Sequence, residues 1–252
     1  MWTVFGYLLF LPMFLSAQPN ESDTLKLKAK LDLTGIWQGG NVQTLIFRAK
    51  SDVTYKPWKK WVFNTKNSYV YQAFGKQKAD EDVLSLNFLY FNPEKSVYPF
   101  LLGIASSNFR RQIDLRYLLG LGATFQLLRA KDNWLKMSIS SEYEETDFKR
   151  ATFNRTDYNV SRTIKTLRST LWVNGKHTLI KDKMLITHES FFQPSVSQGD
   201  NFRWRFEAGL NFPSWKFLEF KISYLHTDES IVIEGQKRED GFLTFGLMVK
   251  NY

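Results

Sequence analysis

Hydrophobic and charged residues alternate strictly near the start of the chain. Residues 25–33 read Leu-Lys-Leu-Lys-Ala-Lys-Leu-Asp-Leu, so every second side chain is apolar and those between are charged. Successive side chains of a β-strand point to opposite faces, and this run therefore predicts a strand with one apolar and one strongly charged face. The same alternation returns about a dozen times along the chain, which predicts an all-β protein.

The alternating runs are long enough to cross a bilayer at a tilt, and their charged faces would have to line an interior. No stretch after the first seventeen residues has the roughly 20 apolar residues that a membrane helix needs. We therefore predict a closed antiparallel transmembrane β-barrel of about 12 strands, built as one domain. The expected strands cover residues 24–38, 42–56, 60–74, 82–91, 97–107, 113–128, 134–146, 158–173, 183–193, 201–212, 216–228 and 241–251.

The connections between these strands alternate in length, as they do in outer-membrane barrels. Short, turn-like connections are expected at 56–60, 92–96, 130–133, 174–176 and 212–215. Longer polar loops are expected at 75–81, 145–157, 194–200 and 227–240, while the first connection, at 39–41, is short although it lies on the loop side. With an even number of strands, both termini fall on the short-turn side, which is the periplasmic side of such barrels.

The parity of the apolar residues predicts which side chains face lipid. Strand 113–128 is the clearest, because its odd positions from Ile113 to Leu127 are apolar. The same rule applies to the two strands before it. In strand 82–91 we expect the outward residues to be Leu84, Leu86, Phe88 and Tyr90, and in strand 97–107 Tyr98, Phe100, Leu102 and Ile104.

The opposite parity predicts a charged lumen. The candidate lumen residues are Arg48, Lys50, Asp52, Lys66, Arg116, Glu142, Arg168, Glu189, Arg203, Arg205, Glu207, Glu219 and Lys221. Charges in such a wall must be paired or hydrated. Two interpretations stay open: a structural network that braces the barrel, and a narrow pore whose basic excess favours anions.

Aromatic residues gather near the predicted strand ends on the short-turn side. Trp and Tyr favour the bilayer interface, where the ring is buried and its polar atom reaches the headgroups. The predicted interface aromatics are Tyr55, Trp58, Trp61, Trp134, Trp172 and Trp215.

The N-terminus predicts export. An apolar core over residues 4–15 precedes Ser16-Ala17 and then polar residues, so we expect a cleavable signal peptide at 1–17 and a barrel domain at 18–252. The chain has no cysteine, which excludes disulfides, thiolate metal sites and an acylated-cysteine anchor. The net charge of +9 is spread among apolar positions, which favours outer-membrane lipids over nucleic acid as partners.

Three segments carry a family resemblance: Gly40-Asn41, the run Leu115-Arg116-Tyr117-Leu118-Leu119-Gly120-Leu121-Gly122-Ala123-Thr124-Phe125, and residues 135–144. The chain resembles, over about residues 25–252, the bacterial outer-membrane barrels grouped as domain of unknown function 481, which include the salt-induced outer-membrane proteins. The resemblance implies a barrel in the outer membrane, inserted by the assembly machinery there. It implies no activity and no site residues, so the expected role is non-enzymatic.

One pattern favours an enzyme instead. His188 and Ser190 share the outward parity, and Asn201 begins the next strand. This set resembles the outer-membrane phospholipase A arrangement, in which an Asn orients the His of a Ser-His pair. The alternative hypothesis is therefore a lipid hydrolase. His177 and His226 have no Asp, Glu or His at ligand spacing, so we predict no metal site and no cofactor.

Overall fold

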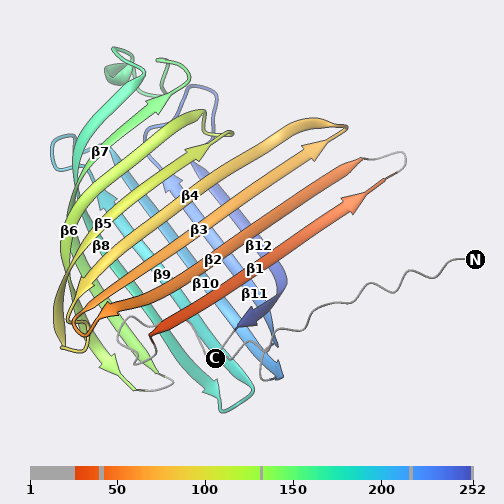
Figure 1. Ribbon diagram of the computed structural model, residues 1–252. Coiled ribbons are helices and arrows are strands. Elements are labelled where there is room, and N and C mark those ends of the chain that lie inside the picture. The colour runs from red at the N-terminus through yellow and green to blue at the C-terminus, as the bar shows by residue number, and fades with distance from the viewer. Residues whose placement is uncertain (1–25, 40–42, 131–132, 216–217, 251–252) are drawn as a thin grey trace, which may run out of the picture.

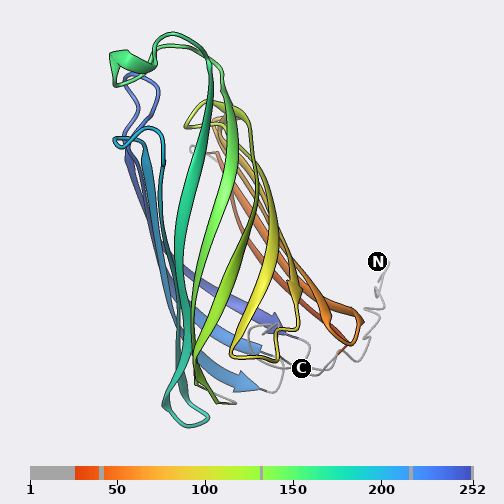
Figure 2. The ribbon, with the colours of Figure 1, turned by 90° about the vertical axis from the view of Figure 1, so that its left-hand side faces the viewer.

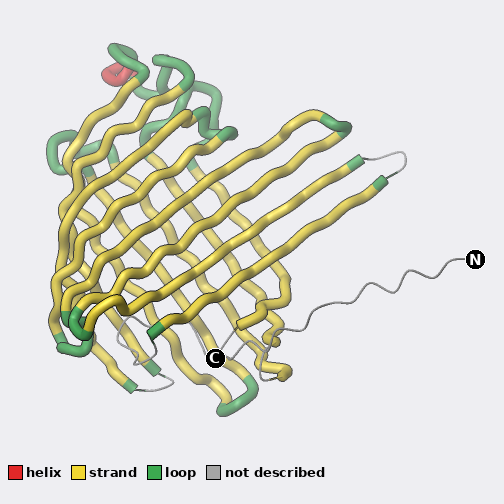
Figure 3. Tube along the Cα trace, in the orientation of Figure 1, coloured by secondary structure: helices red, strands yellow, loops and turns green. Residues whose placement is uncertain are grey.

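The computed structural model describes residues 26–39, 43–130, 133–215 and 218–250, and in them twelve antiparallel strands form one closed barrel. Figures 1 and 3 show the strands wrapping around a single lumen. The strands are β1 (Leu27–Gln38), β2 (Thr44–Trp58), β3 (Trp61–Phe74), β4 (Gln77–Phe91), β5 (Val97–Asn108), β6 (Ile113–Arg129), β7 (Trp134–Phe148), β8 (Thr163–Ile180), β9 (Met184–Pro194), β10 (Phe202–Trp215), β11 (Leu218–Glu229) and β12 (Glu239–Lys250). The predicted fold class is confirmed. The predicted signal peptide lies outside the described residues.

The alternation of the sequence is visible in the exposure of the strands. On β6, Leu119 and Leu121 are each 63% exposed on the outer face, whereas Leu118 beside them is 2% exposed and points inward. On β7, Glu142 and Glu144 are buried inside, and Tyr143 is exposed outside. An apolar outer face and a polar inner face are what a membrane-spanning strand requires.

Two predicted connections are wrong, one in length and the other in position. The segment 75–81 is a tight hairpin, because Gly75 and Lys76 both adopt left-handed φ values of 56° and 65° and β4 begins at Gln77. The Asn174-Gly175 pair, predicted as a turn, lies inside β8, which continues to Ile180. A Cβ on Gly175 would lie 2.6 Å from Nε2 of His188 on β9, so this glycine makes room for a neighbour instead of reversing the chain.

The two ends of the barrel differ. Longer connections follow β7, β9 and β11, and Figure 2 shows them gathered at the upper end, above one half of the barrel. Phe153 of the first connection pairs with Ile233 of the third, and both belong to a buried apolar cluster with Ile113, Phe148 and Ile164. The only helix in the described residues, the 3-10 turn Thr156–Tyr158, lies in the same region. No helix of the described chain is long and apolar enough to cross a membrane.

The seam between the first and last strands is short. β1 and β12 pair at Lys30↔Lys250 and Leu31↔Val249, and above this level no further pair forms between described residues of the two strands. β1 pairs with β2 from Leu27 to Gln38, along its whole length. Figure 1 shows the upper end of β1 well away from that of β12.

Candidate functional site

The structure places the predicted lumen charges on the inner face of the barrel. Arg48, Lys50, Arg116, Glu189, Arg203, Arg205 and Glu207 line an upper cavity of about 280 Å³. Asp52, Lys66 and Lys221 line a lower cavity of about 140 Å³. The remaining three, Glu142, Arg168 and Glu219, are each at most 3% exposed on the inward parity of β7, β8 and β11.

Ion pairs cross the lumen between strands that are not neighbours in the sheet. Lys66 of β3 pairs with Glu189 of β9 at 3.0 Å, and Lys50 of β2 lies 3.6 Å from Glu207 of β10. Arg205 also donates to Glu207 at 2.8 Å. These side chains line both cavities or the boundary between them, so the two cavities lie in series and the ion pairs narrow the passage that joins them.

A second charged group lies beside β7 in the upper lumen. Glu144 accepts hydrogen bonds from Arg168 at 2.6 Å and from Arg203, and Arg116 lies 3.8 Å away. Arg116 also forms a two-point pair with Glu229 at 2.8 and 3.0 Å. A buried charge that loses its partner is strongly destabilising. The ion pairs therefore hold β6, β7, β8, β10 and β11 in one arrangement.

Sequence reasoning missed seven of the charges that line the upper cavity, among them four near the mouth. Arg110 and Arg111, in the turn after β5, both reach Asp240 of β12, at 3.3 and 2.9 Å. Glu229 closes β11 at a position assigned to a loop. These four residues lie outside the predicted strands, where side chains do not alternate between two faces. The sequence therefore gave no indication that they point into the lumen.

The charge of the two cavities differs. The lower cavity is lined by five basic residues, Lys30, Lys50, Lys66, Arg205 and Lys221, and by three acidic residues, Asp52, Glu189 and Glu207. The upper cavity is lined by seven basic and seven acidic residues. The described lumen therefore has a local excess of positive charge in its lower part.

The inner wall of β4 and β5 is apolar, which corrects the predicted orientation of these strands. Phe88, Tyr98, Phe100 and Leu102 are buried, and Leu84, Leu86 and Ile104 line the upper cavity. The outer face of the same strands carries Val83, Phe91 and Leu101, which are exposed. Both faces of these strands are apolar. The rule that the apolar face points to lipid therefore could not tell which face is the outer one.

Two of the six predicted interface aromatics lie inside. Trp172 lines the upper cavity and packs against Phe191, with ring centroids 4.7 Å apart. Trp134 is 7% exposed and shares the inward parity of Lys136, whose Nζ lies 5.2 Å from the ring centroid. Both were assigned by their place near a strand end, without regard to parity, and parity decides their side.

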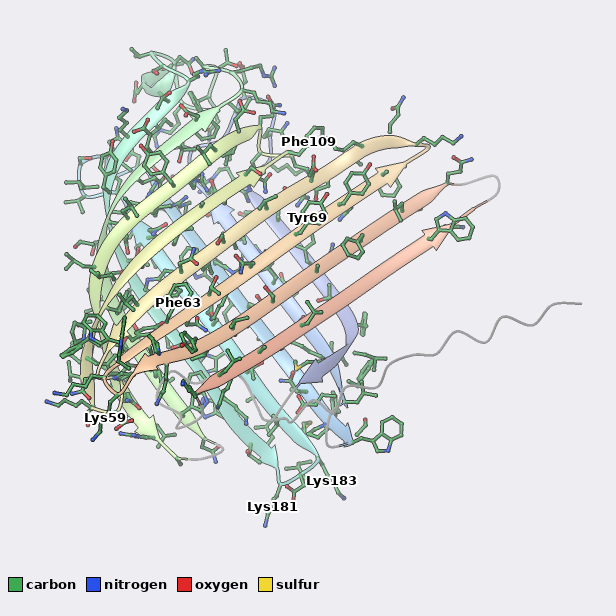
Figure 4. The ribbon with its side chains drawn as sticks, viewed as in Figure 1. Lys59, Phe63, Tyr69, Phe109, Lys181 and Lys183 are labelled. Atoms are coloured by element: carbon green, nitrogen blue, oxygen red, sulfur yellow. The ribbon has the colours of Figure 1, made fainter. Side chains whose placement is uncertain are left out.

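The other four aromatics lie on the outside at the short-turn end. Tyr55, Trp58 and Trp215 are 41%, 70% and 66% exposed. Trp61 packs against Phe91, with ring centroids 5.0 Å apart. Figure 4 shows Lys59, Lys181 and Lys183 at the tips of the turns at this end.

The residues of the proposed hydrolase do not meet. His188 pairs across the sheet with Ala208, seven residues from Asn201, which corresponds to about 23 Å along a strand. Asn201 is buried inside, where its side-chain oxygen accepts a hydrogen bond from Arg168 at 2.8 Å. His188 instead stacks on His177, with 3.2 Å between the Nε2 atoms. The predicted triad geometry is wrong, because Asn201 lies before the start of β10, far from the residue that pairs with His188, and its side chain points into the barrel.

The histidine pair was not foreseen, because it depends on the register that sets Gly175 opposite His188. No group of three or more His, Cys, Asp or Glu side chains in the described residues could hold a metal ion. Outside the strands, burial raises the pKa of the Tyr158 phenol in the loop cluster at the upper end.

Comparisons with known proteins agree with this architecture. Residues 31–250 match the family described as "Protein of unknown function, DUF481". The NanC porin structure is similar at 11% sequence identity, with a TM-score of 0.51 over 89% of this chain and 98% of that one. The translocator domain of the autotransporter NalP from Neisseria meningitidis is similar at 11% identity, with a TM-score of 0.44 over 90% and 87%. No curated protein matches. The fold is that of the outer-membrane β-barrels.

Proposed function

The chain belongs to the family described as protein of unknown function DUF481, and we propose that it is a non-enzymatic, narrow passive channel for small solutes in the bacterial outer membrane. The proposal includes a preference for anions. In this setting its partners are the outer-membrane lipids that surround it and the machinery that inserts barrels there.

The observation that carries this proposal is the lower cavity, with five basic residues against three acidic ones. Fixed positive charge in a confined, poorly polarisable space raises the local concentration of anions and lowers that of cations. A barrel of twelve strands is wider than one whose interior side chains fill completely, and narrower than the porins with open aqueous channels. The ion pairs that join Lys66 to Glu189 and Lys50 to Glu207 reduce the passage further, which restricts it to small solutes.

Planar-bilayer recording across a potassium chloride gradient tests the proposal. The purified barrel is expected to give discrete conductance steps, with a reversal potential displaced toward the chloride equilibrium potential. A reversal potential displaced toward that of potassium would contradict the charge argument.

A cross-braced structural barrel is the second candidate, favoured by the buried group of Glu144, Arg168 and Arg203. Such a barrel would give no conductance steps, although it would still migrate faster unheated than boiled on a denaturing gel. The same recordings therefore separate the two functions.

A further inference from the structure

The open part of the seam between β1 and β12 poses a physical problem inside a membrane. Above the pair Leu31↔Val249, the described residues of the two strands do not pair with each other. Unpaired backbone N–H and C=O groups at membrane depth need hydrogen-bond partners, and they are tolerated where they line a water-filled cavity such as the lumen behind this seam. Extension of the register places Gly35 and Trp37 of β1 opposite Phe245 and Leu243 of β12, and the unpaired stretch between these two edges is called the lateral opening.

Arg48 lies at the level of the lateral opening. It is the cross-strand partner of Thr34 on β1, and its guanidinium carbon lies 5.5 Å from the ring centroid of Phe242 on β12, two strands away in the barrel. In the described part of the chain no carboxylate lies within ion-pair distance of Arg48, and its buried Nε has no hydrogen-bond partner. Other upper-cavity arginines, such as Arg110 and Arg116, have carboxylate partners. Arg48 is therefore the cation with capacity to bind an anion.

The cavity beside Arg48 has an apolar side. Val70, Leu84, Leu86, Ile104 and Leu118 line it from the wall of β3 to β6. A cavity of about 280 Å³ with an aliphatic wall, beside an arginine that has no carboxylate partner among the described residues, fits a ligand with a short apolar chain and a single anionic group.

We propose that a single-chain anionic amphiphile, of the fatty-acid type, enters from the membrane through the lateral opening and binds with its head on Arg48 and its chain along the aliphatic wall. This goes beyond the channel proposed above, which concerns water-soluble ions passing along the axis. The lateral route follows from the chemistry of the ligand, because an acyl chain is concentrated in the bilayer and not in the water above the mouth.

Binding of radiolabelled decanoate to the barrel in lipid nanodiscs tests the proposal, with empty nanodiscs subtracted. Decanol removes the charge and acetate removes the chain, and both are expected to compete at least tenfold more weakly than unlabelled decanoate. Arg48→Gln is expected to weaken decanoate binding about tenfold, as the loss of a charge-assisted hydrogen bond would.

A reversible cross-link tests the route. Extending the observed register sets Gly35 opposite Phe245, and the native chain has no cysteine. Because the two strands are not paired at this level, Gly35→Cys and Phe245→Cys are joined by a bifunctional methanethiosulfonate reagent, which can span a distance too long for a direct disulfide. The cross-link is expected to slow decanoate uptake at least tenfold, with recovery on reduction. The control pairs Ile222→Cys with Phe245→Cys, which joins strands that are already paired and leaves the opening free.

Decanoate that binds no better than decanol, binding that Arg48→Gln does not weaken, or uptake that the cross-linked seam does not slow would overturn the proposal. A dimer in detergent with no decanoate binding would mean that a second copy covers the strand edges instead. Conductance measured on the same preparations keeps the two proposals apart: a barrel that binds decanoate without conducting refutes only the channel, and one that conducts without binding decanoate refutes only the amphiphile site.

Discussion

The lumen has two unlike walls. β4 and β5 present aliphatic and aromatic side chains to it, among them Phe88 and Phe100, whereas β7 to β10 present buried charges such as Glu144 and Arg203. The apolar wall packs like the core of a soluble protein, without directional bonds. The charged wall is fixed by hydrogen bonds whose loss leaves single charges buried. One barrel therefore uses two kinds of interior, and the boundary between them forms the cavities.

Removing Glu144 should have the largest effect on stability. Glu144→Ala leaves Arg168 and Arg203 buried beside Arg116 without their shared acid, which should cost about 3–5 kcal/mol of unfolding free energy. Urea unfolding in detergent, followed by the shift between folded and unfolded bands on an unheated gel, measures it. Glu234→Ala removes an exposed carboxylate from the loop after β11 and should leave the midpoint nearly unchanged. Equal midpoints for the two variants would contradict the role assigned to the charged wall.

The apolar wall should respond to added volume. A Cβ on Gly122 would lie 2.6 Å from Cζ of Phe100 and closer still to the carbonyl oxygen of Ile139. Gly122→Ala should therefore destabilise the barrel by about 1–3 kcal/mol through overpacking. A Cβ on Gly199 would meet no atom within 4 Å, so Gly199→Ala provides the control. If Gly122→Ala and the control were equally stable, the apolar wall around Gly122 would be less closely packed than the structure shows.

Quenching of tryptophan fluorescence by lipids tests whether a given Trp side chain faces the lumen or the membrane. The substitutions are expected to affect the barrel less than the two described above. The chain has eight Trp residues, so variants that keep only Trp58 or only Trp172, with Phe at the others, report one site each. Lipids brominated on their acyl chains near the headgroup should quench Trp58 strongly and Trp172 weakly. Comparable quenching of both would mean that Trp172 lies at the membrane interface and not in the lumen.

Strand number, connectivity and most inward charges were predictable because one parity of those strands is apolar and the other charged. The same rule failed for β4 and β5, where Leu84 to Phe91 carry apolar residues on both parities and only packing across the lumen selects the inner one. Turn propensity failed at Asn174-Gly175 because both residues pair with β7 on one side and with β9 on the other, so the strand continues through them. Contacts such as Lys66 with Glu189 join residues 123 positions apart and depend on closure of the whole barrel, which no local pattern encodes.

The ion preference of the lower cavity tests the account most directly. Lys30→Gln with Lys221→Gln leaves three basic residues against three acidic ones in its lining. Lys181→Gln with Lys183→Gln removes the same charge from an exposed turn outside the lumen. Under a potassium chloride gradient, the account predicts that the first pair moves the reversal potential to near zero, while the second pair keeps the anion preference of the native barrel. An anion preference that survives loss of Lys30 and Lys221, or that disappears equally in both variants, would contradict it.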